Sequence, residues 1–196
     1  LDLKLLRENP DFALLVGDVI YPRGELENYH AGFFRPFAEF IRERPIYPVL
    51  GNHDVMTANG APFLTTFTLP EDGIGEHCFT IRDGPLRVIG LDLNGEIDGK
   101  HRTMQWLRRV LESATEPWVL VYNHYPLRSV YRSAPRPDLM QHYGPLCREY
   151  GVDLICAGHD HNYQRYGQPG ETLEIVTGGG GKSLYEIRQR PEGLVV

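Results

Sequence analysis

Apolar residues fall along the chain in short continuous runs, separated by longer stretches of mixed polarity. A continuous run of this kind is typical of a strand that is covered on both faces. Such runs occupy residues 12–16, 46–50, 118–122, 152–156 and 173–176. Two more runs, 78–82 and 86–91, flank a turn at 83–85 and predict a hairpin. Pro48 lies inside one run and favours an irregular or edge strand there.

Other stretches have the three-to-four-residue spacing of an amphipathic helix. The first such pattern is formed by Phe33, Phe34, Phe37, Phe40 and Ile41. Pro36 is compatible with this helix if it lies in the first turn. A second helix is predicted from Met104, Leu107, Val110 and Leu111, and a third at 139–150. We interpret 59–72 and 128–137 as loops, and the glycines at 178–181 as a loop that needs free backbone dihedrals.

Strands that alternate with helices predict an α/β fold, to which the hairpin adds an antiparallel part. No internal repeat, low-complexity tract or linker interrupts the chain. We therefore expect residues 1–196 to form a single domain, in line with a length of 196 residues.

The composition of the chain limits which classes of binding partner we expect. The chain is 41% hydrophobic and 23% charged, which is ordinary for a globular protein, and its net charge is −6. No stretch is dense in Lys and Arg, so nucleic acid is not a favoured partner. No apolar run approaches the length of a membrane span, so we expect no membrane partner. The spacing of Cys78, Cys147 and Cys156 is not that of a zinc module; Cys156 is interpreted as a buried thiol, and a Cys78–Cys147 disulfide stays open.

Four short polar blocks come directly after apolar runs. They are Gly-Asp-Val-Ile-Tyr at 17–21, Gly-Asn-His-Asp at 51–54, Asn-His at 123–124 and Gly-His-Asp-His at 158–161. The carboxyl ends of parallel strands meet at one edge of a sheet, where open α/β folds bind ligands. We therefore expect these four blocks to lie close together.

The first two blocks contain side chains with more than one possible role. Asp18 can approach and bridge two metal ions, although a strand-end aspartate is also a common helix cap. Tyr21 follows by about one tight turn and can reach the same point, yet a lone tyrosine is more often a packing residue. Asn52 can bind a hard ion through its amide oxygen or serve as a turn residue. His53 needs no metal at this edge and can act as a general acid.

The remaining blocks supply histidines. His124 ends a predicted strand. His159 and His161 are two residues apart, so in an extended segment both imidazoles point the same way and can share a metal. Each residue alone has an ordinary structural explanation, but ligand types after four separate runs indicate a pair of metal ions. The other histidines follow no strand pattern and are interpreted as surface or helix-face residues: His30, His77, His101 and His142.

In these blocks the chain resembles the calcineurin-like metallophosphoesterases, and within them the purple acid phosphatase-like group. The group's motifs Gly-Asp-x-x-Tyr, Gly-Asn-His-Asp/Glu, a histidine block and Gly-His-x-His stand here in the same order. The tyrosine of the first of these separates this group from other metallophosphoesterases. The resemblance implies a four-layer α/β/β/α sandwich of two mixed sheets, with helices outside.

The resemblance also implies roles for the residues. One metal, usually ferric iron, would bind Asp18, Tyr21 and His161, with an aspartate from a further block. A second metal, commonly zinc, iron or manganese, would share Asp18 and bind three more side chains, Asn52, His124 and His159. His53 would assist the leaving group or hold the phosphoryl group.

Two features depart from the group's pattern. Its first, aspartate-containing block does not precede Phe12, so we expect a domain truncated at the N-terminus and also at the C-terminus, with its first metal site incomplete. The missing strand would lie upstream of Leu1. The plant members carry paired histidines shortly after the histidine block, where this chain has Ser133 and Ala134. The flanking arginines either bind phosphate or form a solvated loop: Arg128, Arg132 and Arg136.

The expected activity is hydrolysis of phosphate monoesters at a binuclear metal centre, with a metal-bound hydroxide as nucleophile and a small phosphorylated substrate. A phosphodiesterase or nucleotidase on the same scaffold is the alternative. A non-catalytic domain that binds metal or phosphate is a further alternative, against which the intact set of ligands argues. The resemblance alone favours a secreted or periplasmic location. Oligomeric state stays open.

Overall fold

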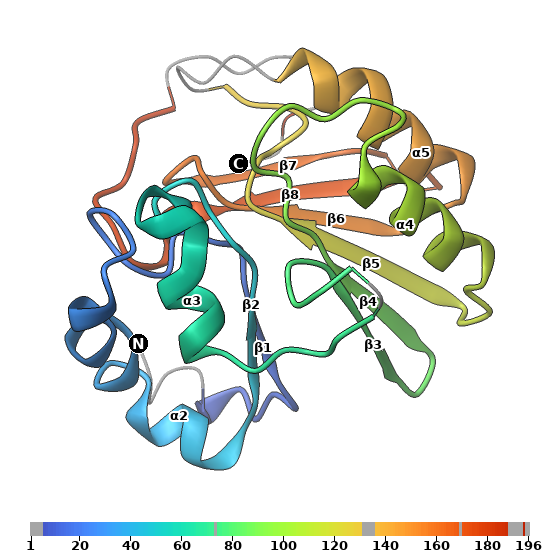
Figure 1. The fold of residues 1–196 in the computed structure, drawn as a ribbon. Coiled ribbons are helices and arrows are strands. Elements are labelled where there is room, and N and C mark those ends of the chain that lie inside the picture. Colours follow the sequence, from blue (N-terminus) through green and yellow to red (C-terminus); the bar gives the residue numbers. More distant parts are fainter. Residues whose placement is uncertain (1–5, 73, 131–135, 169, 188–193, 195–196) are drawn as a thin grey trace.

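The computed structural model describes residues 6–72, 74–130, 136–168, 170–187 and 194. Two sheets form the centre of the molecule (Figure 1). The smaller sheet pairs β1 (Ala13–Leu15) with β2 (Ile46–Pro48) in parallel. The larger sheet has six strands, in the spatial order β3 (Phe79–Asp83), β4 (Leu86–Gly90), β5 (Trp118–Asn123), β6 (Leu154–Ala157), β8 (Leu173–Thr177) and β7 (Tyr163–Tyr166).

The four central strands of the larger sheet, β4, β5, β6 and β8, run parallel to one another. The two outer strands, β3 and β7, are antiparallel to their neighbours, so this sheet is mixed. The predicted hairpin is confirmed by the pairing of β3 with β4. As expected for parallel strands, the carboxyl ends of β5 and β6 lie at the same edge of the sheet.

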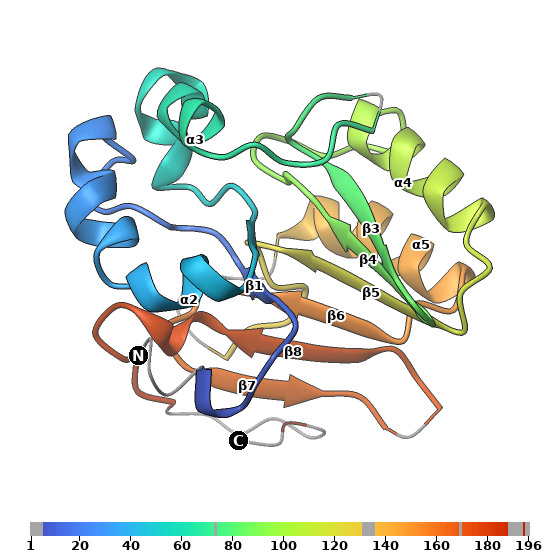
Figure 2. The same ribbon diagram turned by 90° about the horizontal axis from the view of Figure 1, so that it is seen from below.

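Helices lie outside both sheets (Figures 1 and 2). The larger sheet carries α4 (Arg102–Glu112) and α5 (Gly144–Glu149) on one face, and the small sheet lies on the other face, with α2 (Ala38–Glu43) and α3 (Ala61–Thr66) beyond it. This arrangement confirms the predicted α/β/β/α sandwich. Short 3-10 or π turns occupy Leu26–Asn28, His30–Phe34, Asp54–Met56, Ala58–Gly60, Leu139–Tyr143 and Gly178–Gly180.

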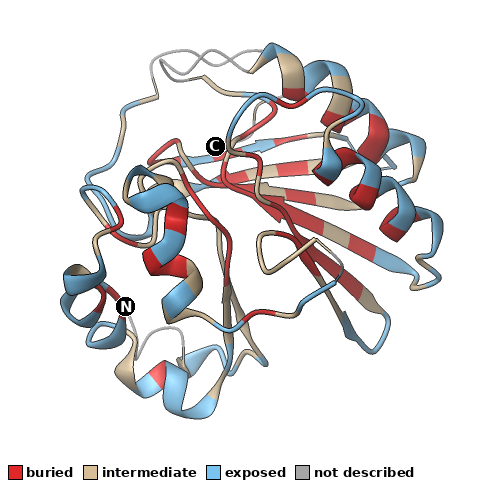
Figure 3. Cartoon of the chain, viewed as in Figure 1, coloured by how far each residue is buried: buried red, intermediate tan, exposed pale blue. Residues whose placement is uncertain are grey.

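The central strands are mostly buried (Figure 3), and most of their residues are apolar on both sides because each side faces a hydrophobic cluster. Ile89 and Val121 pack in the cluster beneath α4 and α5. Their neighbours Val88 and Tyr122 point the other way, into the cluster shared with the small sheet. Burial on both faces explains why these strands read as continuous apolar runs.

Two helical predictions need correction. The pattern at 33–41 does not form one helix: a π turn ends at Phe34, and α2 begins at Ala38, beyond Pro36. Proline lacks the N–H that a continuous helix needs, so it separates the two segments. The predicted loop at 59–72 contains α3. Gly60 precedes this helix in a left-handed conformation (φ 84°), and Pro62 occupies its first turn, a favourable place for proline.

The strand β7 was not predicted, because one of its inward-facing residues is polar. Gln164 is fully buried and Tyr166 is 4% exposed, whereas Tyr163, which points to the other side of the strand, is 46% exposed. The buried amide of Gln164 donates hydrogen bonds to the side chains of Asp160 and Asn162. The alternation expected of a strand is therefore present, but hydrophobicity alone does not reveal it.

The glycine run also has a different explanation from the predicted one. None of Gly178–Gly181 has a left-handed φ. Instead, a Cβ on Gly178 would lie 2.3 Å from the carbonyl oxygen of Asp160, so close packing requires the glycine. All three cysteines are free thiols, which rules out the Cys78–Cys147 disulfide. No helix in the described part of the chain is long and apolar enough to cross a membrane.

Candidate metal centre

The loops that follow β1 and β2 are joined by the buried carboxylate of Asp54. Its oxygens accept hydrogen bonds from the backbone N–H groups of Val19 (3.2 Å), Ile20 (3.1 Å) and Gly51 (2.9 Å). Burial raises the pKa of Asp54, although these N–H groups favour the carboxylate. Asp54 was not among the predicted site residues. It nevertheless positions the loop that carries Asp18.

Asp18 lies between the two loops in a left-handed backbone conformation (φ 54°). Its Oδ1 accepts a hydrogen bond from the N–H of His53 at 2.9 Å, and its Oδ2 lies 3.4 Å from His124 Nε2. Burial alone would raise the pKa of Asp18, but hydrogen bonds to its carboxylate, including the one from the N–H of His53, lower it to about 2. The loops can approach this closely because a Cβ on Gly51 would lie only 2.2 Å from Asp18 N. Asp18 is therefore held as an ionised carboxylate.

Tyr21 and His161 lie on one side of Asp18, and we call them the Tyr21 set. The Tyr21 hydroxyl lies 3.0 Å from Asp18 Oδ2 and 3.1 Å from His161 Nε2. His161 Nδ1 lies 3.1 Å from the carbonyl oxygen of Ser183, which can only accept, so Nδ1 carries the proton and Nε2 a lone pair. One phenolic proton thus faces two acceptors. Burial and the Asp18 charge raise the pKa of Tyr21, so only a bound cation would make it a phenolate ligand.

Asn52, His124 and His159 lie on the other side of Asp18, and we call them the Asn52 set. His124 Nδ1 donates to the carbonyl oxygen of Val16 at 2.8 Å, which leaves a lone pair on Nε2. That Nε2 lies 2.9 Å from Asn52 Oδ1 and 3.2 Å from His159 Nδ1. His159 Nδ1 is itself 3.0 Å from Asn52 Oδ1. Burial lowers the pKa of His159, which favours its neutral imidazole.

The two sets have the chemistry of a cation site. Lone pairs on His124 Nε2, Asn52 Oδ1 and the Asp18 carboxylate face one another with too few protons to share, and a cation would satisfy them. Carboxylate, amide, phenol and imidazole donors suit hard to borderline ions. Within the described residues, no three His, Cys, Asp or Glu side chains form a metal cage on their own. Two of the six donors here are Asn and Tyr. Together with Asp18 and three histidines they form a mixed set of ligand types that suits a metal ion.

His53 and Lys182 lie at the exposed side of Tyr21. His53 Nδ1 lies 2.5 Å from the carbonyl oxygen of Pro22, and its ring is 4.4 Å from the ring of Tyr21. Its Nε2 makes no hydrogen bond within the described part of the chain, which leaves that atom available to a ligand. Lys182 Nζ lies 4.4 Å from the centre of the Tyr21 ring. No pattern in the sequence singled out Lys182, because it comes far along the chain from every polar block.

A model of the calcineurin-like phosphoesterase family matches residues 2–163 of this sequence. The chain belongs to the calcineurin-like phosphoesterase family. The match includes all four polar blocks.

Individual relatives agree with this assignment. Human tartrate-resistant acid phosphatase type 5 is 28% identical over 202 residues, which cover 89% of this chain and 62% of the human protein. A purple acid phosphatase from yellow lupin seeds has the same fold, with a TM-score of 0.82, 20% identity, and coverage of 100% of this chain and 41% of the lupin chain. The Plasmodium protein GAP50, described as an anchor in the inner membrane complex, matches with a TM-score of 0.77 at 15% identity, over 100% of this chain and 70% of its own. The chain therefore spans less than two thirds of the human relative.

The loop arginines of this chain contact other protein groups in the structure. Arg128 Nε donates to the buried carboxylate of Glu174 at 2.8 Å, and its guanidinium lies over the Tyr166 ring. Arg136 pairs with Asp138 and donates to the carbonyl oxygen of Leu93 at 2.7 Å. These contacts favour a structural role. Arg132, Ser133 and Ala134 lie outside the described residues.

Tyr125 is a neighbour of the Asn52 set that sequence reasoning missed. Its ring centre lies 5.1 Å from the ring centres of both His124 and His159. Its hydroxyl donates to Asn94 Oδ1 at 3.0 Å. Tyr125 comes immediately after a predicted ligand, and that adjacency is the one signal that could have identified it.

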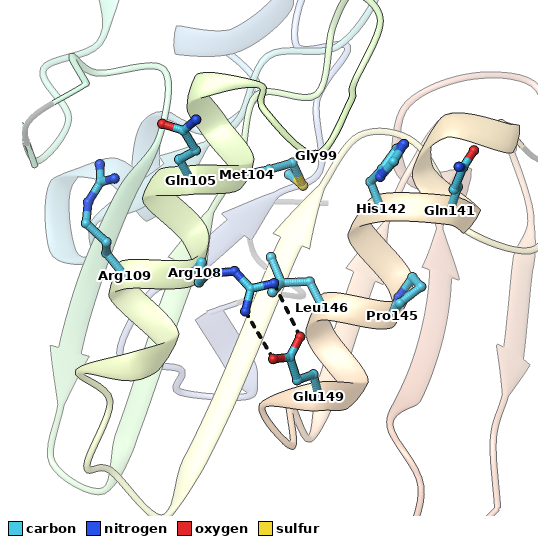
Figure 4. A pocket seen from close by; sticks show the side chains of 10 residues that line it. All are labelled: Gly99, Met104, Gln105, Arg108, Arg109, Gln141, His142, Pro145, Leu146 and Glu149. Atoms are coloured by element: carbon cyan, nitrogen blue, oxygen red, sulfur yellow. Dashed lines mark hydrogen bonds and ion pairs between the residues drawn. The ribbon is translucent and has the colours of Figure 1, made fainter.

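Other histidines and hollows lie apart from this site. His77 pairs with Asp92 at 3.0 Å, and His101 accepts a hydrogen bond from Thr103 N at the start of α4. A groove between α4 and α5 is spanned by the ion pair of Arg108 with Glu149, at 3.0 Å (Figure 4). It includes none of the predicted ligands.

Proposed function

We propose that the full-length protein hydrolyses phosphate monoesters at a binuclear metal centre to which the Asn52 set, the Tyr21 set and Asp18 contribute. The observation that carries the proposal is the convergence of six donor side chains whose lone pairs face one another without enough protons. Membership of a phosphoesterase family, and similarity to acid phosphatases, supports the same reaction class. We treat residues 1–196 as one domain that contains this site.

Two bound cations would polarise the phosphoryl group and activate a water molecule for in-line attack. Asp18 would be a ligand common to both sets, since its Oδ2 contacts both Tyr21 and His124. The phenol of Tyr21 suits ferric iron, and the Asn52 set suits zinc, iron or manganese. No serine or cysteine nucleophile is then required.

His53 is the side chain placed to transfer a proton. Pro22 holds its Nδ1 through a carbonyl oxygen, so Nδ1 is the protonated nitrogen of the neutral ring. A protonated Nε2 could then protonate the leaving group or bind a phosphoryl oxygen. His53→Ala should lower kcat by about a hundredfold or more and leave the metal content unchanged. Unchanged turnover would remove His53 from the mechanism.

Metal analysis and kinetics of the full-length protein test the proposal. We expect two metal ions per chain and turnover of an aryl phosphate monoester that exceeds turnover of the matching diester. A faster diester reaction would shift the assignment to a phosphodiesterase, and nucleotide specificity would point to a nucleotidase. Less than one metal per chain with no hydrolysis would favour a non-catalytic domain.

A further inference from the structure

One segment after β8 encloses His161 on several sides. We call residues 178–185 the glycine strap. The carbonyl oxygen of Ser183 accepts the hydrogen bond from His161 Nδ1 at 3.1 Å. The N–H of Tyr185 donates to the carbonyl oxygen of His161 at 2.8 Å. The Tyr185 ring stacks on the His161 imidazole, with ring centres 4.2 Å apart and planes inclined by 14°. The strap therefore contacts the edge, the face and the backbone of a single histidine.

Gly178 seats the strap against the loop that carries His161. A Cβ on Gly178 would lie 2.3 Å from the carbonyl oxygen of Asp160 in that loop, whereas one on Gly179 would lie 2.9 Å from Leu184 Cδ2 within the strap itself. Backbone atoms cannot move aside as a flexible side chain can, so the Gly178 contact fixes the depth of the strap. This seating brings Ser183 and Tyr185 to His161.

A comparison with His124 shows which contact the strap supplies to His161. The His124 side chain is 1% exposed, and its Nδ1 is fixed by the end of β1 through Val16. His161 follows a strand end by four residues, and its Nδ1 donates the equivalent hydrogen bond to the carbonyl oxygen of Ser183 in the strap instead. Its ring face is covered by Tyr185. The direction of His161 Nε2 is thus set by residues more than twenty positions later in the chain.

We propose that Tyr185 is a positioning residue for His161: by stacking on the imidazole and holding its main chain, it aims His161 Nε2 at the Tyr21 hydroxyl. The idea that His161 and Tyr21 together bind a metal rests on the function proposed above. The stacking of Tyr185 on His161 and the tautomer of His161 do not depend on that function. Outer groups that orient a ligand histidine typically change metal affinity by about 10- to 100-fold.

Three variants of the full chain separate this role from general support. Tyr185→Ala removes the ring, Tyr185→Phe keeps the stack without the hydroxyl, and Leu184→Ala is a control in the same strap, since Leu184 is 71% exposed. In metal-free protein, NMR should show His161 protonated on Nδ1 and shifted upfield by the Tyr185 ring. We expect that shift to vanish in Tyr185→Ala and to persist in the other two.

Competition with a chromophoric chelator then measures zinc affinity. We expect Tyr185→Ala to bind one of two Zn²⁺ ions about 10- to 100-fold more weakly, and Tyr185→Phe and Leu184→Ala to match the unaltered protein within about threefold. If Tyr185→Ala does not fold, Tyr185→Leu replaces it, because leucine keeps the apolar cover without an aromatic face.

The two readouts distinguish the two proposals. Undiminished zinc affinity in a folded Tyr185→Ala protein would overturn the positioning role, as would His161 protonated on Nε2 or an unchanged His161 shift. If the unaltered protein binds no zinc at all, the proposed function fails. The positioning role is then decided by the His161 shift and tautomer alone.

Discussion

The two halves of the candidate site carry similar donors on either side of Asp18, yet they are supported in different ways. In the Asn52 set, His124 is almost fully buried and is held by Val16 at the end of the neighbouring sheet's first strand. In the Tyr21 set, Tyr21 belongs to a turn, and His161 depends on the glycine strap. One half is built from strand ends, and the other from segments beyond them.

The two halves therefore differ in how their side chains are held in place. Strand ends are fixed by the hydrophobic clusters on both sides of the sheet, so the Asn52 set comes with the fold. The Tyr21 set needs a later segment to return to the same edge. We therefore expect changes in the strap to affect the Tyr21 set alone, and changes at Asp18 to affect both.

The largest effect should come from Asp18, because both halves share its carboxylate. Asp18→Ala should lose both metal ions and lower turnover by at least about a thousandfold, which corresponds to several kcal/mol of lost stabilisation. Metal content and kcat measure the result, with Asp11→Ala as a matched control, since Asp11 is exposed and precedes β1, whereas Asp18 follows it. A variant that keeps one tightly bound ion would mean that the halves are independent.

A smaller and selective effect should separate the halves. Tyr21→Phe should lose the ion of the Tyr21 set and any visible absorption due to a tyrosinate–iron bond, while the Asn52 set keeps its ion. Asn52→Ala should do the reverse. We expect each to weaken one ion by about 10- to 100-fold. Absorption spectra and metal affinity check this.

Loss of both ions in either single variant would contradict the division into two sets. A colourless protein that holds zinc or manganese would remove the iron assignment and leave the two sets intact.

The same difference explains what could be predicted from the sequence. The Asn52 set was predictable because its residues follow apolar runs directly, and a strand end needs only local information. The strands themselves were predictable because burial on both faces makes the runs continuous. Asp18 and Tyr21 were also predicted, since their loop adjoins a strand.

What supports the site was not predictable, since it depends on contacts distant in the sequence. Asp54 binds backbone N–H groups more than thirty residues away, and nothing near it in the chain reveals them. Tyr185 contacts His161 only because the glycine strap returns to it. The strand β7 was hidden by a polar residue, Gln164, whose partners lie in the loop before it.

Substitution of one glycine in each half tests how much each kind of support contributes to stability. Gly51→Ala and Gly178→Ala would each force a Cβ within 2.2–2.3 Å of neighbouring atoms, so we expect each to lower the free energy of unfolding by about 1–3 kcal/mol. Gly180→Ala is the matched control, because no atom lies within 4 Å of its added Cβ. Urea unfolding measures all three.

Beyond stability, Gly51→Ala should disturb both metal sites, because Asp18 is the residue it displaces. Gly178→Ala should weaken only the ion of the Tyr21 set. Equal loss of stability in Gly180→Ala would show that the run is sensitive to any side chain, and close approach to Asp160 would then not be the reason for glycine.

The smallest effect should come from His77, which pairs with the carboxylate of Asp92 apart from the candidate site. Its hydrogen bond to Asp92 raises the pKa of His77, so the folded state binds the proton more tightly than the unfolded state. The resulting stability is fully present below the ordinary histidine value of about 6.5 and is lost as pH rises through the raised value. His77→Gln should therefore cost less than about 1 kcal/mol at pH 6, because the pair is partly exposed, and nothing at pH 9. Urea unfolding at the two pH values checks this, and an equal cost at both would mean that His77 stabilises the fold by packing rather than through its charge.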